Sequence, residues 1–539
     1  MRVPRLVLYP LFAAAYPVVA LAAGNPGEVP GLWVLVWPLA VSLSVSLCAW
    51  LLLGGFTRDQ DRRAFLTLMV VVVFSWYGYF TNGLESVAWA VPFSRTVWPF
   101  LFALAYLAVI TYLVFRLVSN LSLLTRFLTI FTSILLVWTS VNLLRHTTTW
   151  LDFTSAPKQS TNLPRILPGA ERKPGPDIYL IVLDKYTGSR SLRENFGFDN
   201  TDFETFLKDR GFVLPRSAQA NYMYTQLSLA SLLNFRYLDD LPSETSAETR
   251  TKLYVNDLVE DNAVWRFLKT RNYRFIFFPT WFSFTWRNRY ADLQVPHPHQ
   301  IQTEFELVWR RTTLAGPVVT WVCRHFDCAA DTPLAAYGEF LEWKFEQLSG
   351  VPVWARARQP LFVFAHISIP HEPYVFNADC SVRPPFWRLL QDEKPENQAY
   401  VAQIACLNQK LKSVVERILR DSPAPPVILL QSDHGHGRML TPYPDVDQAE
   451  PERVAIRADV FAAYYLPGAA SGIIHDSITP VNVFRTVFRQ YFRADLPPLP
   501  DKTYWSPGVQ MFKFTRVNRG QRWPDQGIAP VTPASSQRE

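Results

Sequence analysis

Five long apolar stretches dominate the first 145 residues of the 539-residue chain. None contains an Asp, Glu, Lys or Arg, and each approaches the roughly 20 residues that a helix needs to cross a bilayer. Trp and Tyr lie near several of their ends, as is typical of a membrane–water interface. The stretches are residues 6–23, 31–55, 64–84, 96–115 and 127–144. The pattern predicts an N-terminal α-helical transmembrane bundle of about five helices, residues 1–145.

Basic residues between the stretches set the predicted orientation, because Lys and Arg accumulate on the cytoplasmic side of a membrane. They precede the first stretch, follow the second and flank the gap after the fourth, whereas the loops 24–30 and 85–95 hold only Arg95. The N-terminus is therefore expected inside and everything after the fifth stretch outside. A second interpretation takes residues 1–23 as a cleaved secretory signal ending in Ala-Leu-Ala-Ala, which leaves four spans and the same orientation.

Polar segments divide the rest of the chain. Residues 146–175 are polar and contain Pro, which predicts a linker, and residues 511–539 form a polar tail. Between them, residues 176–510 alternate short apolar runs with amphipathic patterns such as Asp202–Arg210 and a stretch from about Asn397 to Leu419. The apolar runs are Ile178–Leu183, Tyr273–Phe278, Leu361–Ala365, Val427–Leu430 and Val460–Tyr465. Buried strands separated by helices predict an α/β domain with a mostly parallel central sheet covered on both faces.

Composition adds two constraints. The net charge of +7 is spread thinly, without the basic clusters of a nucleic-acid-binding protein. Four of the five cysteines lie in the polar part of the chain, at Cys323, Cys328, Cys380 and Cys406. Two disulfides are expected if this part faces an oxidising compartment; free buried thiols are the alternative, and a zinc site fits the spacing least.

Residues with metal-binding side chains follow three of the predicted strands. Asp184 comes directly after the first, His366 follows Leu361–Ala365 with His371 five residues later, and Asp433-His434-Gly-His436 follows Val427–Leu430. Ligands bind at the carboxyl ends of parallel strands. One such Asp or His alone is more often a turn former, a cap or a hydrogen-bonded core residue. Their coincidence at three strand ends predicts a divalent metal site.

Thr225 is a candidate hydroxyl nucleophile, in the segment that runs from Asn221 to Asn234. Thr225 stands where an apolar pattern begins a helix, so its hydroxyl would feel the positive end of the helix dipole. The backbone N–H groups beside it could hold a phosphate or sulfate. The alternative is that Thr225 only caps the helix.

The order of these motifs resembles the alkaline phosphatase superfamily. The sequence shows Asp184, then Thr225-x-x-Ser228, then His366-x4-His371-x-Pro, then Ser-Asp433-His434-Gly. Within that superfamily it is similar to the sulfatase-like, membrane-anchored branch, which includes lipoteichoic acid synthases, phosphoethanolamine transferases and phosphoglycerol transferases. The resemblance covers about residues 177–500 and the layout of the anchor, and it implies a sulfatase-like catalytic domain outside the cytoplasm.

The resemblance implies a role for each matching position. Thr225 would be the nucleophile and a metal ligand with Asp184, Asp433 and His434, and His371 and His366 would be catalytic. His371, His436 and Asn221 would contact the substrate. One divalent ion is implied, Mn or Zn and possibly Mg. The sequence departs from the pattern with Asp184 where the transferases usually have Glu, with Lys185 beside it, and with His436 where an acidic residue often stands.

The function implied is transfer of a phospho-group from a membrane phospholipid donor to an envelope glycan or glycolipid, of the phosphoglycerol or phosphoethanolamine type, through a phospho-threonine. A phosphodiesterase is the first alternative; a sulfatase is disfavoured because Thr225 replaces the Cys that becomes formylglycine. A non-catalytic, membrane-anchored envelope protein is the second. The aromatic and basic residues of 281–345 have two accounts, a collar on the bilayer or an insertion with its own packing.

Overall fold

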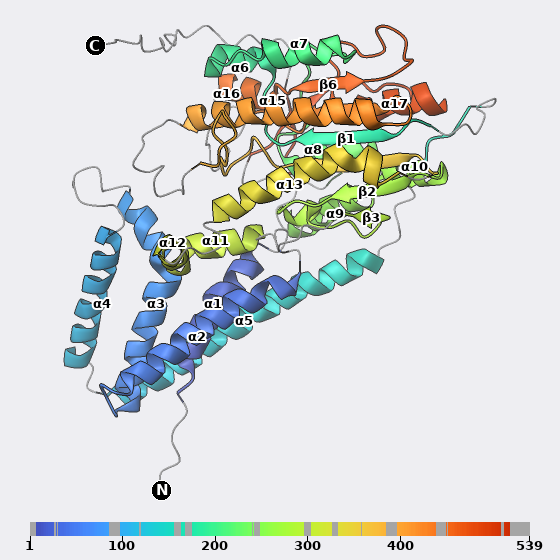
Figure 1. Ribbon diagram of the computed structural model, residues 1–539. Coiled ribbons are helices and arrows are strands. Elements are labelled where there is room, and N and C mark those ends of the chain that lie inside the picture. The colour runs from blue at the N-terminus through green and yellow to red at the C-terminus, as the bar shows by residue number, and fades with distance from the viewer. Residues whose placement is uncertain are drawn as a thin grey trace, which may run out of the picture.

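The first third of the structure is a set of five helices that lies beneath an α/β domain (Figure 1). The computed structural model describes residues 7–25, 29, 31–85, 97–117, 120–155, 163–167, 175–239, 241, 248–295, 303–325, 333–356, 358–383, 396–437, 449, 451–507 and 511–517. The five helices are α1 (Tyr9–Gly24), α2 (Val36–Leu53, preceded by the 3-10 turn Leu32–Leu35), α3 (Gln60–Glu85), α4 (Val97–Leu117) and α5 (Leu121–Ser155). The predicted N-terminal helices are confirmed as helices.

Two of the described helices are long and apolar enough to cross a membrane. They are Leu32–Leu53, with a mean hydropathy of 2.0, and Leu121–Arg145, with 1.9; Tyr9–Gly24 and Leu101–Leu117 are apolar but shorter. Large apolar side chains on these helices point outward, among them Trp37, Leu52, Ile134 and Trp138. A surface of this kind is suited to lipid rather than to water. The structure thus supports two spans, and the expectation of about five is not reached.

The α/β domain is built on a six-stranded sheet in the order β3-β2-β4-β1-β5-β6. Five strands run parallel, and β6 alone pairs antiparallel to β5. The strands are β1 (Ile178–Leu183), β2 (Arg274–Phe278), β3 (Leu293–Gln294), β4 (Leu361–Ile367), β5 (Val427–Ser432) and β6 (Ala462–Tyr465). Every residue of β1, β4 and β5 is buried, which explains their unbroken apolar sequences. The prediction of a mostly parallel central sheet is confirmed.

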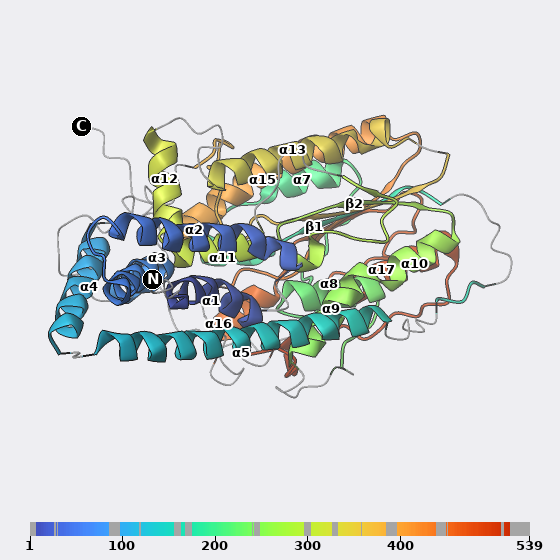
Figure 2. The same ribbon diagram turned by 90° about the horizontal axis from the view of Figure 1, so that it is seen from below.

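Helices cover both faces of this sheet (Figure 2). One layer holds α6 (Ser189–Phe196), α7 (Thr201–Asp209), α13 (Pro333–Trp354) and α15 (Glu396–Asp421), and the other holds α8 (Thr225–Asn234), α9 (Glu248–Glu260), α10 (Ala263–Thr270) and α17 (Val483–Phe492). The remaining elements are α11 (Glu304–Thr312), α12 (Ala315–His325), α16 (Pro451–Ala458), the 3-10 turns Ser283–Thr285 and Pro480–Asn482, and the hairpin of β7 (Thr503–Trp505) and β8 (Thr515–Val517). One apolar core joins the strands to both layers.

The predicted segment boundaries differ from the elements at two places. Helix α5 continues to Ser155, so the beginning of the predicted linker 146–175 is helical, and Ile166 in the same segment bridges to Ala494 of the α/β domain. Strand β8 lies inside the predicted tail 511–539 and pairs with β7. The polarity of these segments predicts neither the end of α5 nor strand β8. Both elements depend on contacts with residues that are distant in the sequence.

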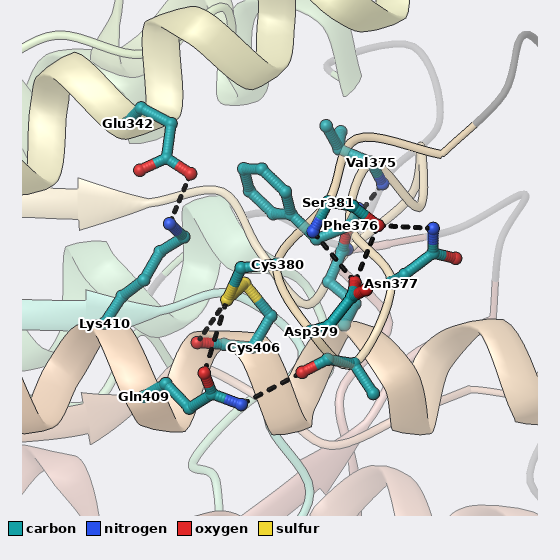
Figure 3. The surroundings of a disulfide bond; sticks show 12 residues. Glu342, Val375, Phe376, Asn377, Asp379, Cys380, Ser381, Cys406, Gln409 and Lys410 are labelled. Atoms are coloured by element: carbon teal, nitrogen blue, oxygen red, sulfur yellow. Dashed lines mark hydrogen bonds and ion pairs between the residues drawn. A yellow bond between two sulfur atoms is a disulfide. The ribbon is translucent and has the colours of Figure 1, made fainter.

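A disulfide joins Cys380 to Cys406, with Cα atoms 4.9 Å apart. Figure 3 shows that it connects the loop after β4 to α15, where Gln409 also donates from its amide to the carbonyl of Ala378. Two disulfides were expected among the four cysteines of this part of the chain, and this is one. Cys328 lies outside the described residues. Disulfides of this kind persist in oxidising compartments.

Helix α11 attaches the α/β domain to the five N-terminal helices. Thr303 and Glu306 cap it reciprocally at its start, and its apolar face buries Phe305 and Trp309. Both side chains belong to a cluster that includes residues of α1, α2, α3 and α5. The structure shows α11 packed against the N-terminal helices, which neither account of the aromatic and basic segment described.

Candidate active site

The carboxyl ends of three adjacent strands bring Asp184, His366 and Asp433 together. Strand β1 lies between β4 and β5, so the residue after β1 has a strand end on each side. His366 Nε2 lies 3.3 Å from Asp184 Oδ2, and both side chains are fully buried. The other ring nitrogen of His366 lies 3.2 Å from the hydroxyl of Thr285. His366 is thus held between the sheet and the turn Ser283–Thr285, with one nitrogen directed at Asp184.

The Asp433 carboxylate is fixed by backbone donors on one side only. Its Oδ1 accepts hydrogen bonds from the N–H groups of Lys185 at 2.9 Å and His434 at 2.8 Å. Its Oδ2 is buried without a hydrogen-bond partner among the described residues, and so are both carboxylate oxygens of Asp184. Burial and the Asp184 charge raise the pKa of Asp433. Burial also acts to raise the pKa of Asp184, but the neighbouring imidazoles of His371 and His366 lower it overall.

These unpartnered oxygens fit a cation. Buried polar atoms without partners are rare in folded proteins, and two buried carboxylates repel each other unless a positive charge lies between them. Asp184, Asp433 and His434 each offer a ligand atom, and the three atoms lie within 4.8 Å of one another. Two carboxylate oxygens and one imidazole nitrogen are a donor set for Zn²⁺ or Mn²⁺.

The tautomer of His434 is set by the backbone. Its Nδ1 lies 3.1 Å from the carbonyl oxygen of Gly435, so Nδ1 carries the proton and Nε2 is left with a lone pair. Burial, followed by the charge of Arg457, lowers the pKa of His434 well below its ordinary value. A neutral imidazole with Nε2 free to donate electrons is the form that binds a metal.

Thr225 points at the same group of side chains. It is the first residue of α8, and the residue before it, Tyr224, makes no side-chain capping bond. The Thr225 hydroxyl lies 3.1 Å from His434 Nε2 instead of bonding to its own helix, and the side chain is partly exposed. The capping alternative therefore does not describe Thr225. Its hydroxyl lies at the positive end of a ten-residue helix, beside the carboxylates.

Arg457 of α16 is a residue of this site that the sequence pattern did not indicate. Its guanidinium donates to the carbonyl of Met223, at 2.7 Å from Nη2, and to the carbonyl of Gly435 at 3.3 Å. Nη2 also lies 3.2 Å from His434 Nε2. Arg457 thus connects the segment before Thr225 to the loop that carries His434, and it adds a buried positive charge. A lone Arg in an amphipathic helix carries no signal of this role.

His371 stands at the exposed side of the site. Its backbone N–H donates to the carbonyl of Asp184 at 3.2 Å, and its side chain is 30% exposed. Beside it, Glu372 pairs with the Nζ of Lys185 at 2.6 Å. Gln403 of α15 holds the same loop by donating to the carbonyl of His371. The unusual Lys185 is thereby neutralised by Glu372, a residue that the motif contained but the sequence did not single out.

Two predicted substrate residues lie apart from this group. The His436 ring is fully buried. It packs against the Tyr400 ring with centres 4.3 Å apart and planes tilted by 55°, and it lies 3.6 Å from Glu396. Burial lowers the pKa of His436 to about 4. The amide of Asn221 is occupied by the backbone, since it accepts from Val481 N–H and donates to the carbonyl of Lys502. Their roles toward a substrate stay predictions.

No family model matches the chain, and no curated protein matches it in sequence. Solved structures do match it. The integral membrane protein lipooligosaccharide phosphoethanolamine transferase A (EptA) from Neisseria meningitidis is 13% identical, with a TM-score of 0.40 over 89% of this chain and 93% of that chain. The C-terminal periplasmic domain of EcEptC from Escherichia coli, in complex with Zn, is 11% identical, with a TM-score of 0.38 over 64% of this chain and 93% of that chain.

A third match is the C-terminal periplasmic domain of the phosphoethanolamine transferase EptC from Campylobacter jejuni, 12% identical with a TM-score of 0.36 over 63% of this chain and 94% of that chain. Phosphoethanolamine transferases are also among the enzymes whose motifs the sequence resembles.

Proposed function

We propose that the chain is a membrane-anchored, metal-dependent transferase that moves a phospho-group from a lipid donor to a cell-envelope glycan or glycolipid. The observation that carries this proposal is the Thr225 hydroxyl, which lies at a helix N-terminus 3.1 Å from His434 Nε2. Beside it are buried carboxylate oxygens that accept no hydrogen bond within the described part of the chain. A hydroxyl becomes a nucleophile when a metal or base lowers its pKa. Both the ligand set and the helix terminus favour an anionic, phosphorus-centred substrate.

A divalent metal bound by Asp184, Asp433, His434 and Thr225 would lower the pKa of the Thr225 hydroxyl and neutralise phosphoryl oxygens. Residues of the chain would bind the phosphoryl group and orient the nucleophile. The backbone N–H groups at the start of α8 bind the phosphoryl oxygens, and His434 keeps its Nε2 toward Thr225 because Nδ1 is engaged by Gly435. Arg457 holds the two loops in register and adds positive charge.

In the first half-reaction, the deprotonated Oγ1 of Thr225 attacks the donor phosphorus, and the bond from phosphorus to the glyceride oxygen breaks. The leaving oxygen takes a proton from His371, whose side chain is exposed to a substrate. In the second, an acceptor hydroxyl gives its proton to His371 and attacks the phospho-threonine, which frees Thr225. His366, fully buried between Asp184 and Thr285, positions the carboxylate.

The location proposed is a bacterial inner or plasma membrane, with the α/β domain in the periplasm or outside the cell. The basic residues between the apolar stretches and the Cys380–Cys406 disulfide both support this side of the membrane. An anchored enzyme meets an anchored donor at a high effective concentration, so the anchor favours a lipid donor. All five apolar stretches are proposed to lie in the membrane.

The test uses the purified full chain with a fluorescent phosphatidylethanolamine or phosphatidylglycerol donor, with and without glycolipid acceptors. The wild type should release diacylglycerol, and mass spectrometry should trap a phosphate-containing adduct on Thr225. Thr225→Ala should lower the rate by at least about 10³-fold, because the group that attacks is gone.

Thr225→Ser is the matched control, since it keeps a hydroxyl at the same position and should retain part of the activity. Full activity of Thr225→Ala, or an adduct on another residue, would disprove the mechanism. Release of diacylglycerol at the same rate with and without any acceptor, with free phospho-head group as the product, would identify a phosphodiesterase instead.

A further inference from the structure

Helix α12 lies at the junction between the N-terminal helices and the α/β domain, and it carries no charged residue before Arg324. Residues 312–323 contain no charged side chain, whereas Arg310, Arg311 and Arg324 flank them. Val318 and Val322, one turn apart on α12, are 48% and 36% exposed. Figure 1 shows α12 end-on beside α3, below the upper end of that helix, and Figure 2 shows it extending outward past α2. An apolar face thus projects from the junction of the anchor and the α/β domain.

The depth of α12 is fixed by its contact with α3. The N–H of Leu314 donates to the carbonyl oxygen of Phe74 at 2.8 Å. Phe74 is the midpoint of the apolar stretch 64–84, so it lies roughly 15 Å along the helix from either end of that stretch. The Cβ of an alanine at Gly78 would overlap the backbone of Arg311, which shows how closely the two segments approach. Helix α12 therefore starts level with the apolar middle of α3.

The turn between α11 and α12 satisfies its polar groups internally. The hydroxyls of Thr312 and Thr313 both donate to the carbonyl of Trp309, at 3.0 and 2.9 Å. With the bond from Leu314 to α3, three polar groups of the turn are bonded within the protein. Irregular backbone at membrane depth is tolerated only when its polar groups are bonded within the protein.

We propose that α12 is embedded in the outer leaflet against α3, with Val318 and Val322 in contact with lipid acyl chains. The inference rests on the proposed membrane anchoring of α1–α5. The occupant of the exposed face is lipid because the face continues the apolar surface of the anchor. Arg310 and Arg311, which precede α12, fit the same position, since long basic side chains can extend to phosphate head groups while their stems remain in the apolar region. The α/β domain would then be attached to the membrane through the partly embedded helix α12 as well as through the linker.

The test places photoreactive benzoylphenylalanine at Val318, at Val322 and at Val213, which is 44% exposed on the α/β domain. The purified full chain is reconstituted in vesicles of equal parts phosphatidylethanolamine and phosphatidylglycerol and irradiated. Lipid adducts, identified by mass, are expected at Val318 and Val322 and not at Val213. A cross-linked dimer, an adduct with another protein, or no lipid adduct at either position would overturn the proposal.

Photolabelling needs no catalysis, so it separates this inference from the proposed activity. Thr225→Ala should keep the lipid adducts at both α12 positions. Val318→Asp should raise the KM for a vesicle-borne donor several-fold and leave kcat for a small soluble phosphodiester unchanged, and Val213→Asp should change neither. Equal effects of the two Asp variants on the vesicle-borne donor would contradict a lipid contact at α12.

Discussion

At the scale of single residues, the site depends on buried carboxylate oxygens that accept no hydrogen bond among the residues the structure describes. Asp184 contributes two and Asp433 one, all buried. Because two backbone N–H groups donate to Asp433 Oδ1, the orientation of the carboxylate, and with it the position of Oδ2, is fixed. Repulsion between these buried carboxylates lowers the free energy of unfolding when no cation is bound. Binding of a cation to the folded state raises the free energy of unfolding again.

Asp433→Asn tests this coupling between metal and stability. The amide keeps an oxygen for the N–H groups of Lys185 and His434 but removes one negative charge. We expect the metal-free variant to melt at the same temperature as the metal-free wild type or higher. Zn²⁺ or Mn²⁺ at about 100 times its Kd should stabilise the wild type by about 2.7 kcal/mol and the variant much less. Differential scanning calorimetry with and without EDTA measures both.

Asp459→Asn is the control, because Asp459 is a partly buried carboxylate outside the metal group whose pKa burial raises to about 6. It should retain the metal-dependent increase of the melting temperature. An Asp433→Asn variant with an unchanged metal-dependent increase would show that Asp433 is not a ligand.

The sequence predicts some residues of this site but not others. Asp184, Asp433 and His434 follow buried strands directly, so strand pattern and residue type suffice to place them together. Arg457 and the pairing of Lys185 with Glu372 had no such marker. Each depends on the packing of a helix or loop that reaches the site from elsewhere, and no local period encodes that contact.

At the scale of elements, the Cys380–Cys406 disulfide secures the loop that carries His371. The loop leaves the sheet after β4, passes His371 and Glu372 and returns to α15, where Gln403 accepts from Val375 N–H and donates to the His371 carbonyl. The covalent bond and the amide thus hold the two parts of one loop on the same helix. Loss of the covalent bond should loosen the exposed side of the site more than the metal group.

Replacing both cysteines by serine, Cys380→Ser with Cys406→Ser, should lower the free energy of unfolding by about 3 kcal/mol, as expected for a bond that closes a loop of this length. The rate of transfer should fall, while metal binding should change little. Calorimetry and metal titration of wild type and variant, each with and without reductant, distinguish these effects. An identical response of both proteins to reductant would show that this disulfide does not form.

The elements themselves were predicted unevenly. The apolar runs located β1, β4 and β5 because these strands are buried on both faces. The antiparallel direction of β6 cannot be read from its residues, since an apolar run looks the same in either direction. Strand β3 has only two residues, and its pairing with β2 follows from the turn before it rather than from a pattern of its own.

At the scale of the whole molecule, the α/β domain and the N-terminal helices meet through α11 and the side of α3. The contact includes the ring pair of Phe74 and Trp309, with centres 6.5 Å apart, and the close backbone approach at Gly78. The junction therefore combines apolar burial with a position that only glycine fits. It holds the α/β domain against the helices that are proposed to form the membrane anchor.

Gly78→Ala is expected to weaken this junction. Alanine favours a helix by about 1 kcal/mol over glycine, so α3 alone would gain stability. The new Cβ would overlap Arg311 O and lie 2.7 Å from the Cα of Thr312, both backbone atoms that cannot turn aside. We expect a lower melting temperature and faster proteolysis between the domains, measured on the full chain in detergent.

Gly24→Ala is the control for this change, because no atom lies within 4 Å of the position of its Cβ. It should be neutral. If Gly78→Ala instead raised the melting temperature, helix propensity alone would govern the position, and the contact between α11 and α3 would be wrong.

The order of the strands has a consequence for the timing of activity during synthesis. The first strand of the sheet, β1, lies at its centre, and Asp184 follows it. Asp433 and then Arg457, which complete the site, are synthesised much later. At about 5–20 residues per second, that delay is on the order of tens of seconds. The proposed anchor precedes all of these residues in the chain. With the proposed function, a nascent chain is attached to its membrane well before its site is complete, so it acquires activity toward the lipids of that membrane only after it is anchored there.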